Sequence, residues 1–325
     1  MDKSSGERKY IFGPVPSRRL GRSLGVDLVP YKICTYDCIY CDLGRTTQKT
    51  MTRQPYVSSD EIRRELESTL PFLSERPDYV TLSGSGEPTL NQNLGRIIHA
   101  VKSLTSIPLA VLTNGSLLFW QDVRDDLREA DVVIPSLDAA TPLSFEHVNR
   151  PHPGLNLEEI VWGFAQFRKE FRNQIWLEVL LCRGINDGRS EVEKIKGILE
   201  RIEPDRVQLN TPVRPPAEEY AFPLTMEQLH EIANQLGGRT EIIPECAASL
   251  GDRFDPNIDA EIAELVKRRP CTVDDISKAL RLHPGAVRKQ LASLEKRGAI
   301  HYYLYQHACY YEHKRRNRSG GIASR

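Results

Sequence analysis

The amino-acid sequence predicts an α/β protein in which a partial (βα)6 TIM-like barrel is followed by a C-terminal winged helix-turn-helix domain. From about residue 24 to residue 240, six short apolar segments alternate with amphipathic helical segments. The apolar segments are hydrophobic nearly throughout, as expected for parallel strands covered by helices. After about residue 257 the pattern changes to three helices and a hairpin. Six strand–helix units make three-quarters of an eight-unit barrel, so we expect an incomplete barrel.

The barrel strands are predicted where β-branched and aliphatic residues concentrate. They are Leu24–Val29, Tyr79–Ser83, Leu109–Thr113, Asp131–Ser136, Ile175–Leu181 and Arg206–Asn210. The helices between and after them are Ser58–Leu70, Leu94–Leu104, Ser116–Glu129, Asn156–Phe171, Arg189–Ile202 and Thr225–Leu236. Ser58 or Ser59 before Ile62 is a typical N-terminal capping residue. Strands and helices that alternate at this length form βα units with a parallel sheet.

The chain is predicted to comprise a core domain at 1–245, a linker at 246–257, a winged-helix domain at 258–313 and a disordered basic tail at 314–325. The expected elements of the winged-helix domain are Ile258–Arg269, Thr272–Leu280, His283–Arg297, Ala299–Tyr305 and Cys309–His313. Thr272 precedes two aspartates, which suits the positive end of a helix. Three helices followed by a hairpin are typical of a winged helix-turn-helix.

The composition is that of a globular protein. Of the 325 residues, 40% are apolar and 27% are charged. No apolar segment reaches the ~18 residues of a membrane span, and the polar N-terminus lacks the apolar core of a signal peptide. We therefore expect a cytoplasmic protein that does not interact with a membrane.

The formal net charge of zero is unevenly distributed. Residues 258–325 contain 14 Lys and Arg against 7 Asp and Glu, a surplus of seven positive charges. The rest of the chain contains 30 against 37, a deficit of seven. The basic C-terminal part either faces an anionic partner or forms a solvated surface.

Three of the seven cysteines lie within eight residues, in Cys34-Thr-Tyr-Asp-Cys38-Ile-Tyr-Cys41. An odd number of cysteines in a chain without secretory features argues against a disulfide framework. Thiolates ligate iron–sulfur clusters, and three cysteines leave one iron of a four-iron cluster open to another ligand. Zinc or unliganded thiols are the alternative, but structural zinc needs four ligands and no second pair is present. Because the loop follows the first predicted strand, we expect it at the C-terminal mouth of the barrel.

The CxxxCxxC spacing, with Tyr40 before the third cysteine, resembles the signature of the radical S-adenosylmethionine (SAM) superfamily. More closely, the segment from Phe12 to Asp27, together with Cys34–Arg45, resembles the family of wyosine-base-related Fe–S oxidoreductases. This resemblance covers about residues 10–245. It implies an enzyme that reductively cleaves SAM with electrons from a reductant such as ferredoxin or flavodoxin. The implied ligands of its [4Fe–4S] cluster are Cys34, Cys38 and Cys41.

The resemblance also implies SAM-binding residues at the ends of the predicted strands. The segment Ser83–Pro88 resembles the GGEP motif of the superfamily, with Ser85 in place of the first glycine of that motif. Glycines there let the backbone approach a ligand closely. The expected SAM contacts are Tyr40, Gly84, Ser85, Gly86, Glu87, Pro88, Asn114, Ser136, Asp138, Glu178 and Asn186.

Several of these residues have an ordinary structural alternative. The GGEP-like segment is also what a plain strand-to-helix turn looks like. Asn114 or Asp138 can cap a helix, and Asn186 can belong to a tight turn. Glu178 lies within an apolar strand, so its carboxylate either points into a polar barrel interior or faces outward.

Six residues are expected near the barrel mouth as substrate contacts, namely Arg18, Arg19, Arg22, Asn149, Arg150 and Arg214. Arginine in such a position suits a phosphate or a carboxylate. The alternative for each arginine is a surface salt bridge. Four further cysteines lack CxxC spacing, so an auxiliary cluster is a minor alternative; they are Cys182, Cys246, Cys271 and Cys309.

The third predicted helix of the winged-helix domain is basic, and its hairpin is aromatic. The side chains concerned are Arg288, Lys289, Lys296 and Arg297 on the helix, and Tyr302, Tyr303, Tyr305, Tyr310 and Tyr311 on the hairpin. Basic and aromatic groups together suit RNA or DNA. The alternatives are a protein or peptide partner, or tyrosines that fill a small core.

Three functional hypotheses follow. The first is radical SAM modification of a substrate, with a base in tRNA or another RNA as the first choice. The second is radical modification of a protein or peptide held by the winged helix. The third is a cluster-containing DNA-binding regulator, which the SAM-pocket segments disfavour because a sensor needs no GGEP-like loop.

Overall fold

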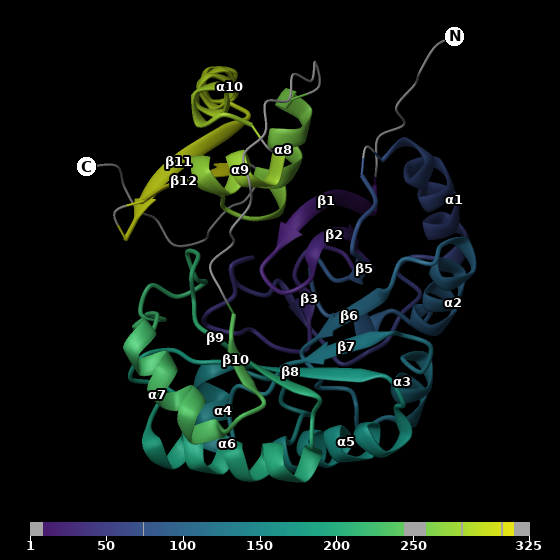
Figure 1. The fold of residues 1–325 in the computed structure, drawn as a ribbon, viewed down its shortest axis with the longest axis vertical. Coiled ribbons are helices and arrows are strands. Elements are labelled where there is room, and N and C mark those ends of the chain that lie inside the picture. Colours follow the sequence, from purple (N-terminus) through teal and green to yellow (C-terminus); the bar gives the residue numbers. More distant parts are fainter. Residues whose placement is uncertain (1–8, 74, 244–257, 281, 307, 315–325) are drawn as a thin grey trace.

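The computed structural model describes residues 9–73, 75–243, 258–280, 282–306 and 308–314 (Figure 1). The predicted linker at 246–257 lies outside the described residues, as does the predicted basic tail apart from Lys314. Within the described residues, no helix combines the length and the apolar character needed to cross a membrane.

The core of the protein is a curved sheet with the strand order β1-β2-β5-β6-β7-β8-β9-β10. Its central strands are parallel and correspond to the six predicted ones: β2 (Gly21–Val26), β5 (Tyr79–Leu82), β6 (Leu109–Thr113), β7 (Val132–Pro135), β8 (Gln174–Leu180) and β9 (Arg206–Asn210). The predicted α/β class with a mostly parallel sheet is therefore confirmed. The first strand was predicted three residues too late, because Asp27–Val29 already belongs to the loop that follows β2.

Two strands at the edges of the sheet were not predicted. β1 (Ile11–Ser17) pairs antiparallel with β2, and β10 (Thr240–Ile242) pairs parallel with β9. β1 contains Gly13, Pro14 and Pro16, which are unusual in strands and are tolerated at a sheet edge. A short parallel pair, β3 (Ile33–Cys34) with β4 (Gln48–Lys49), lies in the loops.

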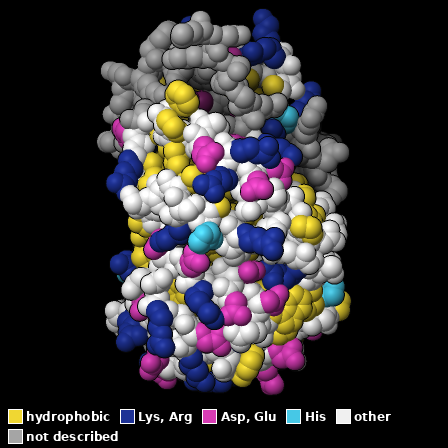
Figure 2. Space-filling model, turned by 90° about the vertical axis from the view of Figure 1, so that its right-hand side faces the viewer, with side chains coloured by type: hydrophobic (Ala, Val, Ile, Leu, Met, Phe, Trp, Pro, Cys, Tyr) yellow, Lys and Arg dark blue, Asp and Glu magenta, His cyan; other side chains and the backbone are white. Residues whose placement is uncertain are grey.

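Helices surround the outer face of the sheet (Figure 1). They are α1 (Ser59–Thr69), α2 (Leu94–Leu104), α3 (Gln121–Asp126), α4 (Pro142–Val148), α5 (Leu157–Glu170), α6 (Arg189–Ile202) and α7 (Met226–Leu236), with 3-10 turns at Leu70–Phe72 and Pro88–Leu90. Each apolar helix face packs on the sheet, as Ile97 and Phe164 illustrate with 0% and 1% exposure. On the solvent side, acidic and basic side chains intermingle (Figure 2), as amphipathic helices require.

The predicted helix Ser116–Glu129 is the clearest local error. Only α3 is helical, and residues 115–120 form tight turns instead. Asn114 Oδ1 accepts a hydrogen bond from Ser116 N, which starts a turn rather than a helix. Gly163 of α5 lies so close to the backbone of Phe119 that a side chain would collide with it. Tertiary packing thus keeps this segment out of a continuous helix.

The C-terminal unit is a winged helix-turn-helix, as predicted. It contains α8 (Ile258–Arg268), α9 (Val273–Leu280), α10 (Pro284–Lys296) and an antiparallel hairpin of β11 (Ile300–Tyr305) and β12 (Ala308–His313). It has its own apolar core, which includes Ile262, Val266, Ile276, Val287 and Leu291. In Figure 1, α8 and α9 face the barrel, α9 contacts β1, and α10 lies on the far side.

Candidate functional site

The loop that carries the cysteine triplet follows β2 and lies at the C-terminal ends of the parallel strands. Its backbone is tied to the end of α4 and to the segment that follows it. Asp37 N donates to Asn149 O at 3.0 Å, Ile39 N donates to Val148 O at 2.9 Å, and His152 N donates to Thr35 O at 2.8 Å. The loop is therefore fixed at the position where sites of parallel barrels occur.

Each of the three cysteine sulfurs accepts a side-chain hydrogen bond from a different part of the chain. Asn114 Nδ2 donates to Cys34 Sγ at 3.5 Å, and Asn149 Nδ2 donates to Cys38 Sγ at 3.5 Å. Lys32 Nζ donates to Cys41 Sγ at 3.2 Å. Hydrogen bonds to sulfur are a feature of protein-bound iron–sulfur clusters, whose potentials they tune. The donor set around these three cysteines therefore fits an iron–sulfur cluster.

Burial also affects the cysteine thiols themselves. It raises the pKa of Cys34 to about 12, and it raises the pKa of Cys38 well above the usual value for a thiol. Buried thiols of this kind are protonated at neutral pH unless a metal centre replaces the proton.

The described residues offer no group of three or more His, Cys, Asp or Glu placed to hold a single metal ion. Of the other cysteines, Cys182 packs with Ile39, Cys271 lies in the winged-helix core, and Cys309 lies on β12. Cys246 lies outside the described residues.

The GGEP-like segment packs directly against the cysteine loop. A side chain at Gly86 would overlap the carbonyl oxygen of Ile33, and one at Gly84 would come within 2.7 Å of the Asp27 carboxyl carbon. Ser85 N donates to Asp27 Oδ1 at 3.0 Å, and Ser85 O accepts from Lys32 N at 2.6 Å. Gly86 is therefore required for the close approach of two backbones, and Gly84 for the close approach of the Asp27 carboxyl group and for its positive φ.

Glu87 connects the ends of two neighbouring strands. Its buried carboxylate accepts hydrogen bonds from Thr113 Oγ1 at 2.6 Å, Asn114 N at 2.7 Å, and Thr89 Oγ1 and N at 2.7 and 3.0 Å. Burial raises the pKa of this carboxyl, although these donors oppose the shift. In this structure both carboxylate oxygens hold the wall of the site together, and Pro88 begins the following 3-10 turn.

Asp138 connects the cysteine loop to β8. Its carboxylate accepts from Tyr40 OH at 2.5 Å, Asn149 Nδ2 at 2.8 Å and Leu180 N at 3.0 Å. Burial raises its pKa to about 6. Asp138 does not cap α4, because the capping side chain there is Thr141.

Asn114 and Asn186 differ in whether their side chains lie beside the cysteine loop. Asn114 starts a turn at Ser116 and also donates to Thr35 Oγ1 at 2.7 Å beside the cysteine loop. Asn186 is fully buried, accepts from Cys182 N, and donates to the carbonyl oxygens of Asp138 and Leu180. The side chain of Asn186 therefore holds its own loop in place.

Glu178 points into the barrel, so its outward-facing alternative is wrong. Its carboxylate forms an ion pair with Arg19 at 2.8 Å and accepts from Asn210 Nδ2 at 2.7 Å. Ser136, directly after β7, lies next to it through an isolated bridge to Glu178. Burial alone raises the pKa of Glu178, but Arg19, Asn210 and Arg18 together hold it below the usual value. The ion pair ties the turn between β1 and β2 to the opposite side of the barrel.

We expect Glu178→Gln to lower the free energy of unfolding by about 3 kcal/mol at pH 7, because the buried Arg19 loses its countercharge. The depressed pKa of Glu178 means that its ionised form stabilises the fold above the unfolded-state value of 4.5. This stabilisation is lost as the pH falls through the folded-state pKa. Urea unfolding at pH 7 and at pH 4 should therefore show a smaller difference between wild type and variant at pH 4. A difference that is the same at both pH values would contradict this assignment.

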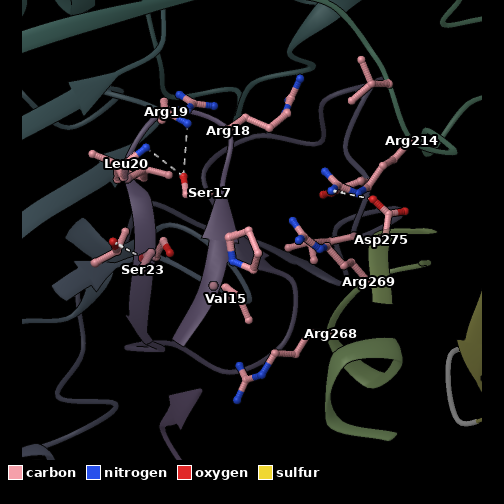
Figure 3. A pocket seen from close by; sticks show the side chains of 18 of the residues that line it. Val15, Ser17, Arg18, Arg19, Leu20, Ser23, Arg214, Arg268, Arg269 and Asp275 are labelled. Carbon is pink, nitrogen blue, oxygen red and sulfur yellow. Dashed lines mark hydrogen bonds and ion pairs between the residues drawn. The ribbon is translucent and has the colours of Figure 1, made fainter. Parts of the chain in front are cut away.

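A cavity of about 400 Å³ lies next to this wall and extends to the winged-helix domain (Figure 3). Of the predicted SAM contacts, Tyr40, Gly84 and Ser85 line it. Of the predicted substrate contacts, Arg18, Arg19 and Arg214 line it. Cys41 also belongs to its wall, so the cavity reaches the cysteine loop.

The other three predicted substrate contacts are not among the lining residues of this cavity. Arg22 pairs with Glu75 at 3.3 Å. Arg150 pairs with Glu218 at 2.6 Å, and Asn149 is buried behind Cys38. The salt-bridge alternative therefore describes Arg22 and Arg150.

Sequence reasoning missed the side chains that the winged-helix domain contributes to the cavity. They are Leu265, Arg268, Arg269, Asp275, Lys278 and Ala279 of α8, α9 and the connection between them. The basic run Lys267-Arg268-Arg269 at the end of α8 was a visible signal. Whether this basic run lines the cavity depends on how the winged-helix domain packs against the barrel.

Comparison with known proteins identifies the class. Residues 28–196 match the model of the radical SAM superfamily, and residues 260–302 match that of the bacterial regulatory protein arsR family. The first match covers more than half of the chain, so the protein belongs to the radical SAM superfamily, whose members are enzymes that use SAM and an iron–sulfur cluster. The superfamily expected from the cysteine motif is thus confirmed.

Within this superfamily, the chain belongs to the UPF0026 family. It is 32% identical over 304 residues to the UPF0026 protein of Helicobacter pylori strain J99, spanning 90% of this chain and 96% of that one. It is 37% identical over 235 residues to the UPF0026 protein of Methanocaldococcus jannaschii, spanning 71% and 73%.

Two further similarities show less about this chain. A protein named GTPase Obg from Brachyspira hyodysenteriae is 37% identical over 301 residues, but this chain spans only 44% of its length. Because this chain spans less than half of that protein, the activity in its name is said of that protein alone. A radical SAM methyltransferase from Sphaerobacter thermophilus superimposes with a TM-score of 0.50 at 17% identity, covering 68% of this chain and 65% of that one. That similarity supports the fold alone.

Proposed function

We propose that this enzyme holds a [4Fe–4S] cluster through Cys34, Cys38 and Cys41 and cleaves SAM reductively in order to modify a base in RNA. The observation that carries the first part is the set of three sulfurs that accept side-chain hydrogen bonds from Asn114, Asn149 and Lys32. When bound, such a cluster supplies the electron that breaks a carbon–sulfur bond of SAM, with ferredoxin or flavodoxin as the source.

The chain's own residues have binding and shielding roles in this proposal. The backbone at Gly84 and Ser85 forms a wall beside the cysteine loop on which the methionine part of SAM can lie. Tyr40, held by Asp138, lies between Cys38 and Cys41 in the loop and closes one side of the cavity. Elements α8 and α9 form part of the cavity wall and limit the access of water from that side, which protects radical chemistry.

RNA as the substrate is supported by the winged-helix domain. Arg288, Lys289 and Lys296 are exposed on α10, which faces away from the barrel, and Tyr302 is 52% exposed on β11. Phosphates and bases are the natural ligands of such a surface. Tyr310, in contrast, is buried and donates to Val213 O at 3.4 Å, so this tyrosine packs against the barrel.

The test is reduction of the anaerobically reconstituted protein in the presence of SAM, with 5′-deoxyadenosine measured by mass spectrometry. We expect its formation, and we expect anaerobically purified protein to carry RNA that nuclease treatment removes. Cluster-loaded, reduced protein that forms no 5′-deoxyadenosine would instead support the cluster-containing regulator. Co-purification of a peptide rather than RNA would support the second hypothesis.

A further inference from the structure

The cavity between the barrel and the winged-helix domain is lined by basic side chains from both. They are Arg18, Arg19, Arg214, Arg268, Arg269 and Lys278, and they face two lining carboxylates, Asp42 and Asp275. The volume of about 400 Å³ is that of a small-molecule site, and its lining runs from the cysteine loop to the winged-helix domain.

Half of these basic side chains are already engaged. Arg19 pairs with Glu178 at 2.8 Å, and Lys278 pairs with Asp274 at 2.6 Å. Arg268 lies 3.8 Å from Asp27 and 3.8 Å above the ring of Phe12, where it closes the lower end of the cavity. The remaining three are Arg18, Arg214 and Arg269.

These three guanidinium groups surround one space from three separate segments of the chain (Figure 3). Arg18 donates to Asn210 Oδ1 at 3.1 Å and has no ion pair with a described carboxylate. Its pKa falls to about 10 because of burial and then the positive charges of Arg214 and Arg19. Like charges gathered in a buried space destabilise one another, and a bound anion relieves this repulsion.

Arg214 and Arg269 complete the set. Arg214 Nη2 lies 3.6 Å from Asp275 Oδ1, which is longer than a charge-assisted hydrogen bond, and its buried Nε has no hydrogen-bond partner among the described residues. Asp275 also uses its other oxygen to accept from Thr272 at the start of α9. Arg269 has no ion pair with a carboxylate in the described part of the chain and comes from the winged-helix domain.

SAM does not account for this cluster, because its sulfonium and ammonium groups outnumber its single carboxylate. A second ligand with negative charge fits these guanidinium groups, although Asp42 and Asp275 already raise the pKa of Arg214 against the effect of burial. Guanidinium forks that approach from three directions match a phosphate, whose several oxygens accept from all of them, better than a carboxylate with two oxygens.

We infer that this cavity binds a phosphate group of the substrate through Arg18, Arg214 and Arg269, so that the winged-helix domain supplies part of the substrate site. The inference rests on the proposed function, because it places the substrate beside the cysteine loop. It also defines the substrate class as a phosphate-bearing nucleotide, either free or within a strand.

The test is calorimetric binding to cluster-loaded protein saturated with SAM, so that the probes do not compete with SAM for its own site. Guanosine 5′-monophosphate is expected to bind at least about 10-fold more tightly than guanosine, with an affinity that falls as salt rises. Arg18→Ala and Arg269→Ala should each weaken this binding at least about 10-fold. Arg22 lies on the same hairpin as Arg18 but outside the cavity, so Arg22→Ala is the matched control. It should change the affinity for guanosine 5′-monophosphate less than about 2-fold.

A short single-stranded RNA forms the second arm and distinguishes a strand from a free nucleotide. Binding of either probe with the stated dependence on Arg18 and Arg269 supports the inference. It is overturned if neither probe binds, if guanosine binds as well as its monophosphate, or if Arg22→Ala weakens binding as much as Arg269→Ala. Arg269→Lys keeps the charge and should recover part of the affinity, which separates phosphate binding from a folding defect. Formation of 5′-deoxyadenosine without phosphate binding would leave the proposed function intact and remove only this inference.

Discussion

Replacement of Cys38 by alanine is expected to remove the iron–sulfur chromophore and to lower 5′-deoxyadenosine formation more than about 100-fold. At the proposed cluster site, loss of one thiolate leaves two protein ligands. Even the hydrogen-bonding partners of metal ligands typically contribute 10- to 100-fold to affinity, so a ligand itself contributes more. Iron and sulfide content, visible absorbance and product formation measure the effect after anaerobic reconstitution.

The same reasoning ranks two further variants. Asn149→Ala removes the donor to Cys38 Sγ and should weaken cluster retention about 10-fold, less than loss of the thiolate. Cys309 lies on β12 of the winged-helix domain, so Cys309→Ala is the matched cysteine control. We expect this variant to keep its full cluster content. Full chromophore in Cys38→Ala, or equal losses in Cys38→Ala and Cys309→Ala, would contradict the assigned ligands.

Gly86→Ala is expected to lower the free energy of unfolding by about 3 kcal/mol and to reduce cluster content, although it changes no polar group. The added methyl group would overlap the carbonyl oxygen of Ile33, which accepts from Glu87 N at 3.1 Å and immediately precedes Cys34. The backbone of one of the two loops must therefore move, and the position of Cys34 moves with it. Urea unfolding and iron content measure the two effects.

Gly197→Ala is the matched control for this substitution. Gly197 lies exposed within α6, and a methyl group there meets no atom within 4 Å. Alanine in a helix interior is favoured over glycine by about 0.5–1 kcal/mol, so this variant should be slightly more stable than wild type. Equal stability of Gly86→Ala and Gly197→Ala would show that the GGEP-like segment is not packed against the cysteine loop as described.

The regular elements could largely be predicted because their signals are local. Apolar runs such as Leu109–Thr113 predict buried strands, and capping residues such as Ser58 predict where helices begin. β1 escaped prediction because Pro14 and Pro16 contradict strand propensity and are tolerated only where a neighbouring strand is absent on one side. The turn before α3 escaped because contact with α5 overrides its helical pattern.

The candidate site was only partly predictable for the same reason. The cysteine motif is contiguous, so its spacing is visible in the sequence. Asn149 was expected to contact substrate, whereas the structure places its amide on Cys38 Sγ, 111 residues away in the chain. Glu178 and Arg19, 159 residues apart, become an ion pair only when the barrel closes.

By itself, the sequence determined the α/β class, the winged helix-turn-helix and the cysteine motif, since short-range periodicity and spacing encode them. The tertiary structure decided which arginines share one cavity. Arg18, Arg214 and Arg269 line the same cavity. Arg22 and Arg150 form ion pairs elsewhere. Such convergence depends on the docking of α8 and α9 onto the barrel. This docking depends on many weak contacts between residues far apart in the chain, so no local sequence pattern predicts it.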